Sequence, residues 1–130
     1  MKNSVITPVI LILAFGPLAC GSSQDKTLTI ETVPVLTVNM PQVTEAGDSV
    51  VIEVTCGTPT PCWDFHQFEI TQSDSEYSII VFAQYDGRPC IQIPGTLTAK
   101  TVIRPARPGR YLFRFNQTDE KVLTKTMAVQ

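Results

Sequence analysis

The chain has little excess charge of either sign and a single histidine, and both scarcities narrow the functions it can perform. Lys and Arg total 10 and Asp and Glu total 12 in 130 residues, which gives a formal net charge of −2. Binding to nucleic acid relies on a basic excess that neutralises phosphates, so the composition argues against that class of partner. A nucleophilic site needs a base beside its nucleophile, and His66 is the only imidazole. We therefore expect a protein that is not an enzyme and that takes no cofactor.

Helical patterning and internal repeats are also missing. From Leu28 onward, no stretch has helical periodicity long enough for a helix, and no low-complexity segment occurs. The chain instead holds short runs rich in Val, Ile, Thr and aromatic residues, separated by Pro, Gly or acidic turns. These runs predict an all-β fold, an antiparallel β-sandwich of about seven strands, with the strands at residues 35–38, 49–55, 65–71, 77–83, 96–103, 111–115 and 121–129.

The run before residue 116 shows which side chains are expected inside. Tyr111, Phe113 and Phe115 share one face of an extended strand, while Arg110 and Arg114 lie on the other. Such a period of two indicates one buried face and one face in water, as in an antiparallel sandwich.

The middle of the chain breaks this alternation. Trp63 and Phe65 have odd numbers, whereas Phe68 and Ile70 have even numbers, so a regular strand would place the two pairs on opposite faces. One extra residue near positions 66–67 would bring both pairs to the same face. We therefore predict a β-bulge there.

Only one long apolar run is present, and it lies at the start of the chain. Residues 5–15 follow the basic Lys2 and contain 11 residues of apolar character. A membrane-spanning helix needs about 20 apolar residues. The run is therefore typical of a secretory signal peptide.

The end of that run resembles the lipobox of bacterial lipoproteins, with Ala19 directly before Cys20. The resemblance implies that residues 1–19 are a signal peptide and that Cys20 carries the lipid that anchors the protein in a membrane. Residues 20–27 are then the lipid anchor and a flexible tether, and residues 28–130 are the folded domain. The alternative is an ordinary signal peptide cleaved just after Cys20, and both interpretations export the protein.

Three cysteines remain beyond Cys20, and an exported protein is expected to form a disulfide. Cys56–Cys62, Cys62–Cys90 and Cys56–Cys90 are all possible pairings on residue order alone. Together with His66 these cysteines form a Cys3His set that could bind zinc. Because an oxidising compartment favours the disulfide instead, we predict no metal site.

The approach to the strand at 111 adds a second resemblance. Gly109 precedes Tyr111, which looks like the tyrosine corner of immunoglobulin-like (Ig-like) domains. The wider pattern is similar to uncharacterised bacterial lipoproteins with an Ig-like β-sandwich domain, and it is carried by Pro61-Cys62-Trp63, Phe68-Glu69-Ile70, Cys90 and Gly109-Arg110-Tyr111.

This similarity implies a fold, a location and a disulfide pairing. The location is the bacterial cell membrane or outer membrane, reached through the lipid on Cys20. The similar lipoproteins carry a cysteine pair that matches Cys62 and Cys90, so the resemblance favours that disulfide. Cys56 is then a free thiol, either buried or at a sheet edge.

Charge is distributed unevenly along the chain. Residues 20–80 hold one Lys and nine acidic residues, while residues 81–130 hold eight basic and three acidic residues. Pairing across strands would neutralise much of this asymmetry. The alternative is a patch for an anionic envelope polymer or lipid head groups, formed by Arg104, Arg107, Arg110 and Arg114.

Three functions compete. The first is a lipid-anchored bacterial cell-envelope protein that acts as a non-enzymatic binding or structural module, whose partner is an unknown envelope protein or polymer. The second is a secreted inhibitor or accessory subunit that inserts a disulfide-braced loop, residues 57–61 or 85–89, into a partner. The third is a small enzyme, and it requires Asp64, His66 and Glu69 to converge in one pocket.

Overall fold

The computed structural model describes residues 27–118 and 120–130. The predicted signal peptide, the predicted lipidation site at Cys20 and tether residues 21–26 lie outside the described residues. Among those described, no helix has the length and apolar character needed to cross a membrane. The described residues form nine strands: β1 (Thr29–Val33), β2 (Val35–Asn39), β3 (Val43–Thr44), β4 (Val50–Thr58), β5 (Asp64–Ser73), β6 (Glu76–Tyr85), β7 (Gly95–Ile103), β8 (Gly109–Thr118) and β9 (Lys121–Val129).

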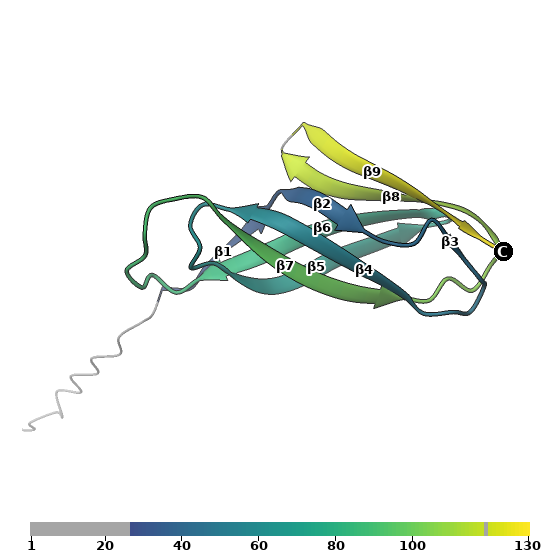
Figure 1. The fold of residues 1–130 in the computed structure, drawn as a ribbon, viewed down its shortest axis with the longest axis horizontal. Helices are drawn as coiled ribbons and strands as arrows, with labels where there is room; N and C mark the ends of the chain where they lie inside the picture. Colours follow the sequence, from purple (N-terminus) through teal and green to yellow (C-terminus); the bar gives the residue numbers. More distant parts are fainter. Residues whose placement is uncertain (1–26, 119) are drawn as a thin grey trace, which may run out of the picture.

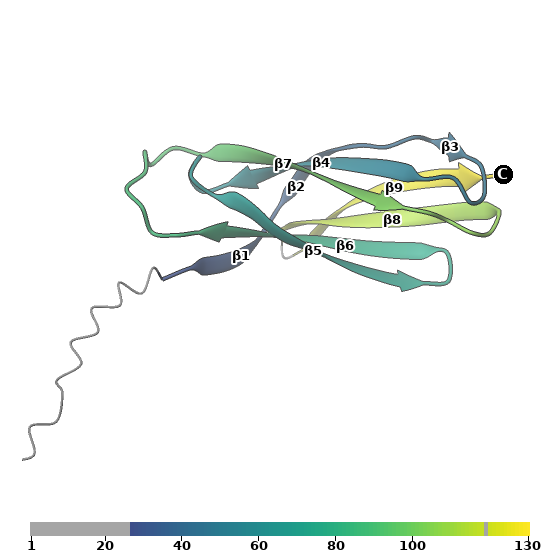
Figure 2. The same ribbon diagram turned by 90° about the horizontal axis from the view of Figure 1, so that it is seen from below.

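The strands make two sheets that face each other, as Figures 1 and 2 show from two directions. The larger sheet has the order β1-β6-β8-β9-β3, and β5 also pairs with β6. The smaller sheet has the order β2-β4-β7. The predicted all-β, two-sheet architecture is confirmed.

Each of the seven predicted strands is present, and β1 and β3 are additional. Pro34 separates β1 from β2, and it cannot donate a ladder hydrogen bond. At this proline the chain passes from the larger sheet to the smaller one, with Val33 and Val35 buried on either side. The predicted strand that begins at residue 35 is therefore preceded by β1, which belongs to the other sheet.

The prediction that all strands pair antiparallel is wrong for two of the seven pairings in the described chain. β6 pairs with β8 in parallel over Glu76–Ile79, and β3 pairs with β9 in parallel. The parallel β6–β8 pair arises because β7, which lies between them in sequence, belongs to the other sheet. The chain crosses between sheets and reverses twice, so β8 runs in the same direction as β6.

The core lies between the two sheets and follows the predicted alternation. In β8, Tyr111, Phe113 and Phe115 are buried, whereas Arg110 and Arg114 are exposed. β4 and β6 alternate in the same way. The predicted inward face of the strand at 111–115 is confirmed.

The predicted bulge is also present. The pairing of β5 with β6 shifts register between Phe65 and Gln67, which leaves His66 as the extra residue. The rings of Phe65 and Phe68 are 4.8 Å apart between centroids, so these two side chains meet. Phe65 and Ile70 nevertheless stay partly exposed, because β5 lies at the outer edge of its sheet and pairs with β6 alone among the described strands.

The start of β8 is fixed by one side-chain hydrogen bond. The hydroxyl of the buried Tyr111 donates to the carbonyl oxygen of Arg107 at 2.8 Å, four residues back along the chain. Gly109 between them has φ +147°, a value that residues with a side chain rarely adopt. The loop from β7 therefore turns into β8 around the tyrosine ring, with the geometry expected of a tyrosine corner.

Tyr111→Phe should lower the free energy of unfolding by about 1 kcal/mol, because the partly buried carbonyl of Arg107 loses its donor while the ring remains in place. Denaturant unfolding of the full chain measures this change. Tyr85→Phe is a suitable comparison, since that hydroxyl bonds to the carbonyl of Arg88 in an exposed setting and should change stability less. Equal losses in the two variants would contradict a special role for Tyr111.

Candidate functional site

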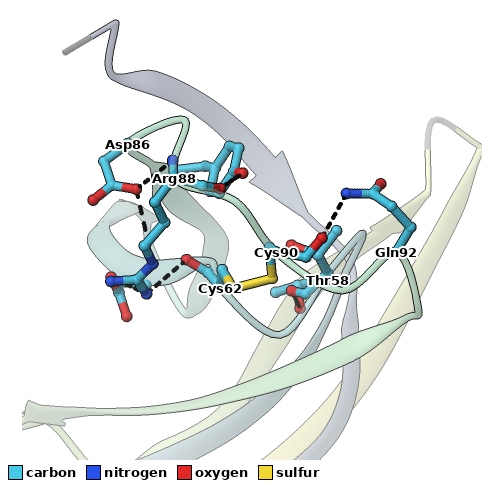
Figure 3. Close-up of a disulfide and its surroundings, with 9 residues drawn as sticks. Thr58, Cys62, Asp86, Arg88, Cys90 and Gln92 are labelled. Carbon is cyan, nitrogen blue, oxygen red and sulfur yellow. Dashed lines mark hydrogen bonds and ion pairs between the residues drawn. A yellow bond between two sulfur atoms is a disulfide. The ribbon is translucent and has the colours of Figure 1, made fainter.

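A disulfide joins two loops at one end of the sandwich. Cys62 follows β4 and Cys90 follows β6, and their Cα atoms are 6.1 Å apart. This is the pairing that the resemblance favoured. The bridge ties the short β4–β5 connection to the longer connection between β6 and β7, residues 86–94, which we call the braced loop (Figure 3).

Arg88 holds the base of the braced loop in place. Its Nη2 atom donates to the carbonyl oxygen of Cys62 at 3.3 Å and lies 3.8 Å from a carboxylate oxygen of Asp64. Its Nε atom lies 3.8 Å from Asp86, whose carboxylate also accepts a 3.1 Å hydrogen bond from the backbone N–H of Arg88 (Figure 3). The hydroxyl of Tyr85 donates to the carbonyl oxygen of Arg88. These contacts, with the disulfide, order the loop before any partner arrives.

The side chains that the braced loop presents to water are apolar. Ile91 is 62% exposed and Ile93 is 50% exposed, both beyond the bridged Cys90. Figures 1 and 2 show this connection extending past the strand ends. A rigid loop with exposed isoleucines can contact a partner at a low ordering cost.

The structure places the exposed apolar residues outside the two segments that the insertion hypothesis named. Gly57 and Thr58 belong to β4, and Thr58 and Thr60 are buried, so the segment 57–61 does not offer a projecting loop. In the other candidate segment, Tyr85 ends β6 and packs its ring on Trp63 at 5.5 Å. The exposed isoleucines, Ile91 and Ile93, follow this segment in the chain. Sequence reasoning missed Ile91 and Ile93, although two isoleucines between a cysteine and Pro94 in a turn region were a usable signal.

Cys56 is the unpaired cysteine of the described chain, and it lies fully buried on β4. Burial in apolar surroundings raises the pKa of its thiol to about 11. The thiolate is the reactive form of cysteine, so this side chain behaves as a small apolar core residue at neutral pH.

The free energy of unfolding should fall as the pH rises from 9 to 11, with about 2 kcal/mol of the fall due to Cys56. In this range the unfolded thiol, with its ordinary pKa of 9.0, loses its proton while the folded thiol keeps it. The stabilising effect is therefore complete below pH 9 and is lost as the pH approaches 11. Denaturant unfolding of wild type and Cys56→Ala at each pH measures the difference, and parallel pH profiles would contradict the assignment.

Two of the four arginines of the predicted patch have polar partners of their own. Arg104 donates to the Ser49 hydroxyl at 2.9 Å. Arg114 lies 3.8 Å from the carboxylate of Glu76. Arg107 and Arg110 do come together, at a surface pocket of about 320 Å³ beside Asp74 and Ser75.

The three residues of the enzyme hypothesis have separate surroundings. Nδ1 of His66 lies 2.9 Å from Oε1 of Gln84, at the bulge of β5. Asp64 is exposed and pairs with Arg88, and Glu69 is exposed further along the same strand. Their side chains are not joined by a hydrogen bond within the described residues. Cys62 and Cys90 are bonded to each other, so neither sulfur is free to bind zinc.

Comparison of the chain with protein-family models, curated proteins and solved structures finds no match.

Proposed function

We propose that the chain is an exported, lipid-anchored protein of the bacterial cell envelope, and that its Ig-like sandwich is a non-enzymatic binding or structural module. The Cys62–Cys90 disulfide carries this proposal, because disulfides persist in oxidising compartments outside the cytoplasm. The apolar segment at residues 5–15 supplies a route of export, and Cys20 supplies a site for the lipid.

The Ig-like part of the proposal is supported by two features of the described residues. Two sheets enclose a single core, and Tyr111 bonds to the carbonyl of Arg107 as in a tyrosine corner. The parallel pairing of β6 with β8 departs from an all-antiparallel arrangement, and it gives this chain its own variant of the sandwich.

An anchor on Cys20 would lie close to the end of the sandwich that carries the braced loop. Thr29, the first residue of β1, pairs with Tyr85, the last residue of β6, so the folded chain begins beside the base of that loop (Figure 1). The eight residues from 20 to 27 can span at most about 29 Å. A partner of the loop would therefore be a protein or polymer near the membrane surface.

Cell fractionation tests the anchor. The wild-type chain made in a bacterium should stay with the membranes in high salt and leave them in detergent, with an intact mass that shows acylation. Cys20→Ser should show no acyl mass, because the residue that would carry the lipid is gone. A wild-type chain whose intact mass shows no acyl group would overturn the lipid anchor.

The secreted inhibitor or accessory subunit is the second candidate, and the exposed Ile91 and Ile93 favour it. Ile91→Thr/Ile93→Thr should reduce crosslinking to the partner at least tenfold in intact cells if the braced loop is inserted. The matched control is Val51→Thr/Val102→Thr, which changes two exposed apolar residues paired across β4 and β7. Equal crosslinking by the two variants would reject loop insertion.

A further inference from the structure

The outer edge of β9 is largely uncovered. On one side β9 pairs with β8 over its whole length, but on the other side β3 covers only Ala128 and Val129. Within the described chain, no strand pairs with the outer edge between residues 121 and 127. An uncovered edge presents backbone N–H and C=O groups that can accept another strand.

The hydrogen bonds between β9 and the segment around β3 show which backbone amides of β9 point away from β8. The amide of Ala128 donates to the carbonyl of Gln42, and the amide of Gln130 donates to the carbonyl of Thr44, each at 2.9 Å. Because backbone groups alternate in direction along an antiparallel pair, the amides of Thr126 and Thr124 also point away from β8. Each lacks a backbone partner among the described residues.

A groove of about 560 Å³ lies beside this edge. We call it the edge groove, and it is lined by Val38, Met40, Pro41, Gln42, Val43, Arg110, Thr124, Lys125, Thr126, Met127 and Ala128. It lies between β9 and the segment that leads from β2 in the smaller sheet to β3 in the larger one. Pairing of β3 with β9 covers Ala128 and Val129, at one end of the groove.

The charge of the edge groove has one sign. Arg110 and Lys125 contribute to its lining, and none of the lining residues is acidic. Neither cation has a carboxylate within 4.0 Å among the described residues, in contrast to Arg114 and Lys100, which pair with Glu76 and Glu53. The groove thus combines free backbone donors, the apolar surface of Val38 and Met40, and two positively charged side chains that form no ion pair within the described residues.

We propose that the edge groove binds an extended segment of a partner protein that adds a strand to β9 and carries a carboxylate toward Lys125 or Arg110. Main-chain hydrogen bonds to Thr124 and Thr126 would supply affinity, and the charged and apolar walls would supply specificity. A second copy of this chain fits poorly, because pairing two β9 edges would bring the same cations together.

The site does not depend on the lipid anchor. β3 and the C-terminus lie at the opposite end of the sandwich from the start of β1 (Figure 1). An incoming segment would therefore reach the edge groove whether or not residue 20 is acylated.

Binding of synthetic peptides to the full chain in mild detergent tests the proposal. The probe is a short labelled peptide that alternates Thr and Val around a central Glu, and its counterpart carries Lys at that place. We expect the Glu peptide to bind more tightly and to slow hydrogen exchange in β9. Lys125→Glu should weaken binding of the Glu peptide roughly fivefold and improve binding of the Lys peptide.

Lys121→Glu is the matched control, because it changes the same charge on the same strand outside the groove and should alter binding less than twofold. Thr124→Pro should abolish binding by removing an outward amide, a change that an edge strand tolerates. The proposal is overturned if exchange in β9 is unchanged by saturating peptide, if the two lysine variants behave alike, or if the edge instead forms dimers of the chain.

Discussion

Cys90→Ala is expected to lower the free energy of unfolding by about 3–4 kcal/mol. Cys62 and Cys90 are 28 residues apart in sequence, and a crosslink over such a distance restricts the unfolded chain by about that amount. The folded state also loses the covalent tie between the two loops, so the braced loop is then held by the polar contacts of Arg88 and Tyr85. Equilibrium unfolding in urea measures the loss, and the slope should also rise, because the unfolded chain without the crosslink is less compact.

Three comparisons make this prediction specific to the bridge. Cys62→Ala and the double variant Cys62→Ala/Cys90→Ala should lose as much as Cys90→Ala, because each removes the same crosslink. The free energy of unfolding of Cys56→Ala should still fall when a reducing agent is added, since this variant leaves the bridge intact. Additive losses in the double variant, or wild-type stability that does not change on reduction, would contradict the prediction.

Strand positions could be predicted because they follow from neighbouring residues alone. The period of two at residues 110–115 records which side of β8 is buried, and the change of parity between Phe65 and Phe68 records the bulge. Sheet membership is different. Whether β6 pairs with β8 in parallel depends on which sheet contains β7. The residues of the three strands do not indicate which sheet that is. The passage between sheets at Pro34 was missed for the same reason.

Features of the candidate sites that depend on contacts between distant parts of the sequence could not be predicted either. Residue order left three cysteine pairings open, because the bridge depends on two loops meeting in space. The partners of Arg104 and Arg114 could not be predicted, because they are distant in sequence. Ser49 is 55 residues from Arg104, and Glu76 comes from a strand that meets β8 only through the unexpected parallel pairing. The edge groove could not be predicted for the same reason, since it exists where β3 pairs with only two residues of β9.

Gly95→Ala is expected to cost about 3 kcal/mol, at the upper end of what overpacking costs in a close-packed region. A Cβ atom at Gly95 would lie 2.6 Å from the Cα atom and 2.7 Å from the nitrogen of Pro61, distances that require backbone to move. It would also lie 2.9 Å from Oγ1 of Thr58, the buried hydroxyl that donates to the carbonyl of Thr60. The turn that must yield is the one that Cys62 ties to the braced loop.

Gly57→Ala is the matched control, because Gly57 lies one residue before the partner of Gly95 in the same pair of strands. The atom nearest to its Cβ would lie in the Leu36 side chain at 3.5 Å, an ordinary contact, so stability should change by less than about 1 kcal/mol. The loss caused by Gly95→Ala should also shrink in a Cys90→Ala background, because the turn at Pro61 is then free to shift. Equal losses in the two glycine variants would contradict the close approach, and equal losses with and without the bridge would mean that the disulfide does not hold the turn.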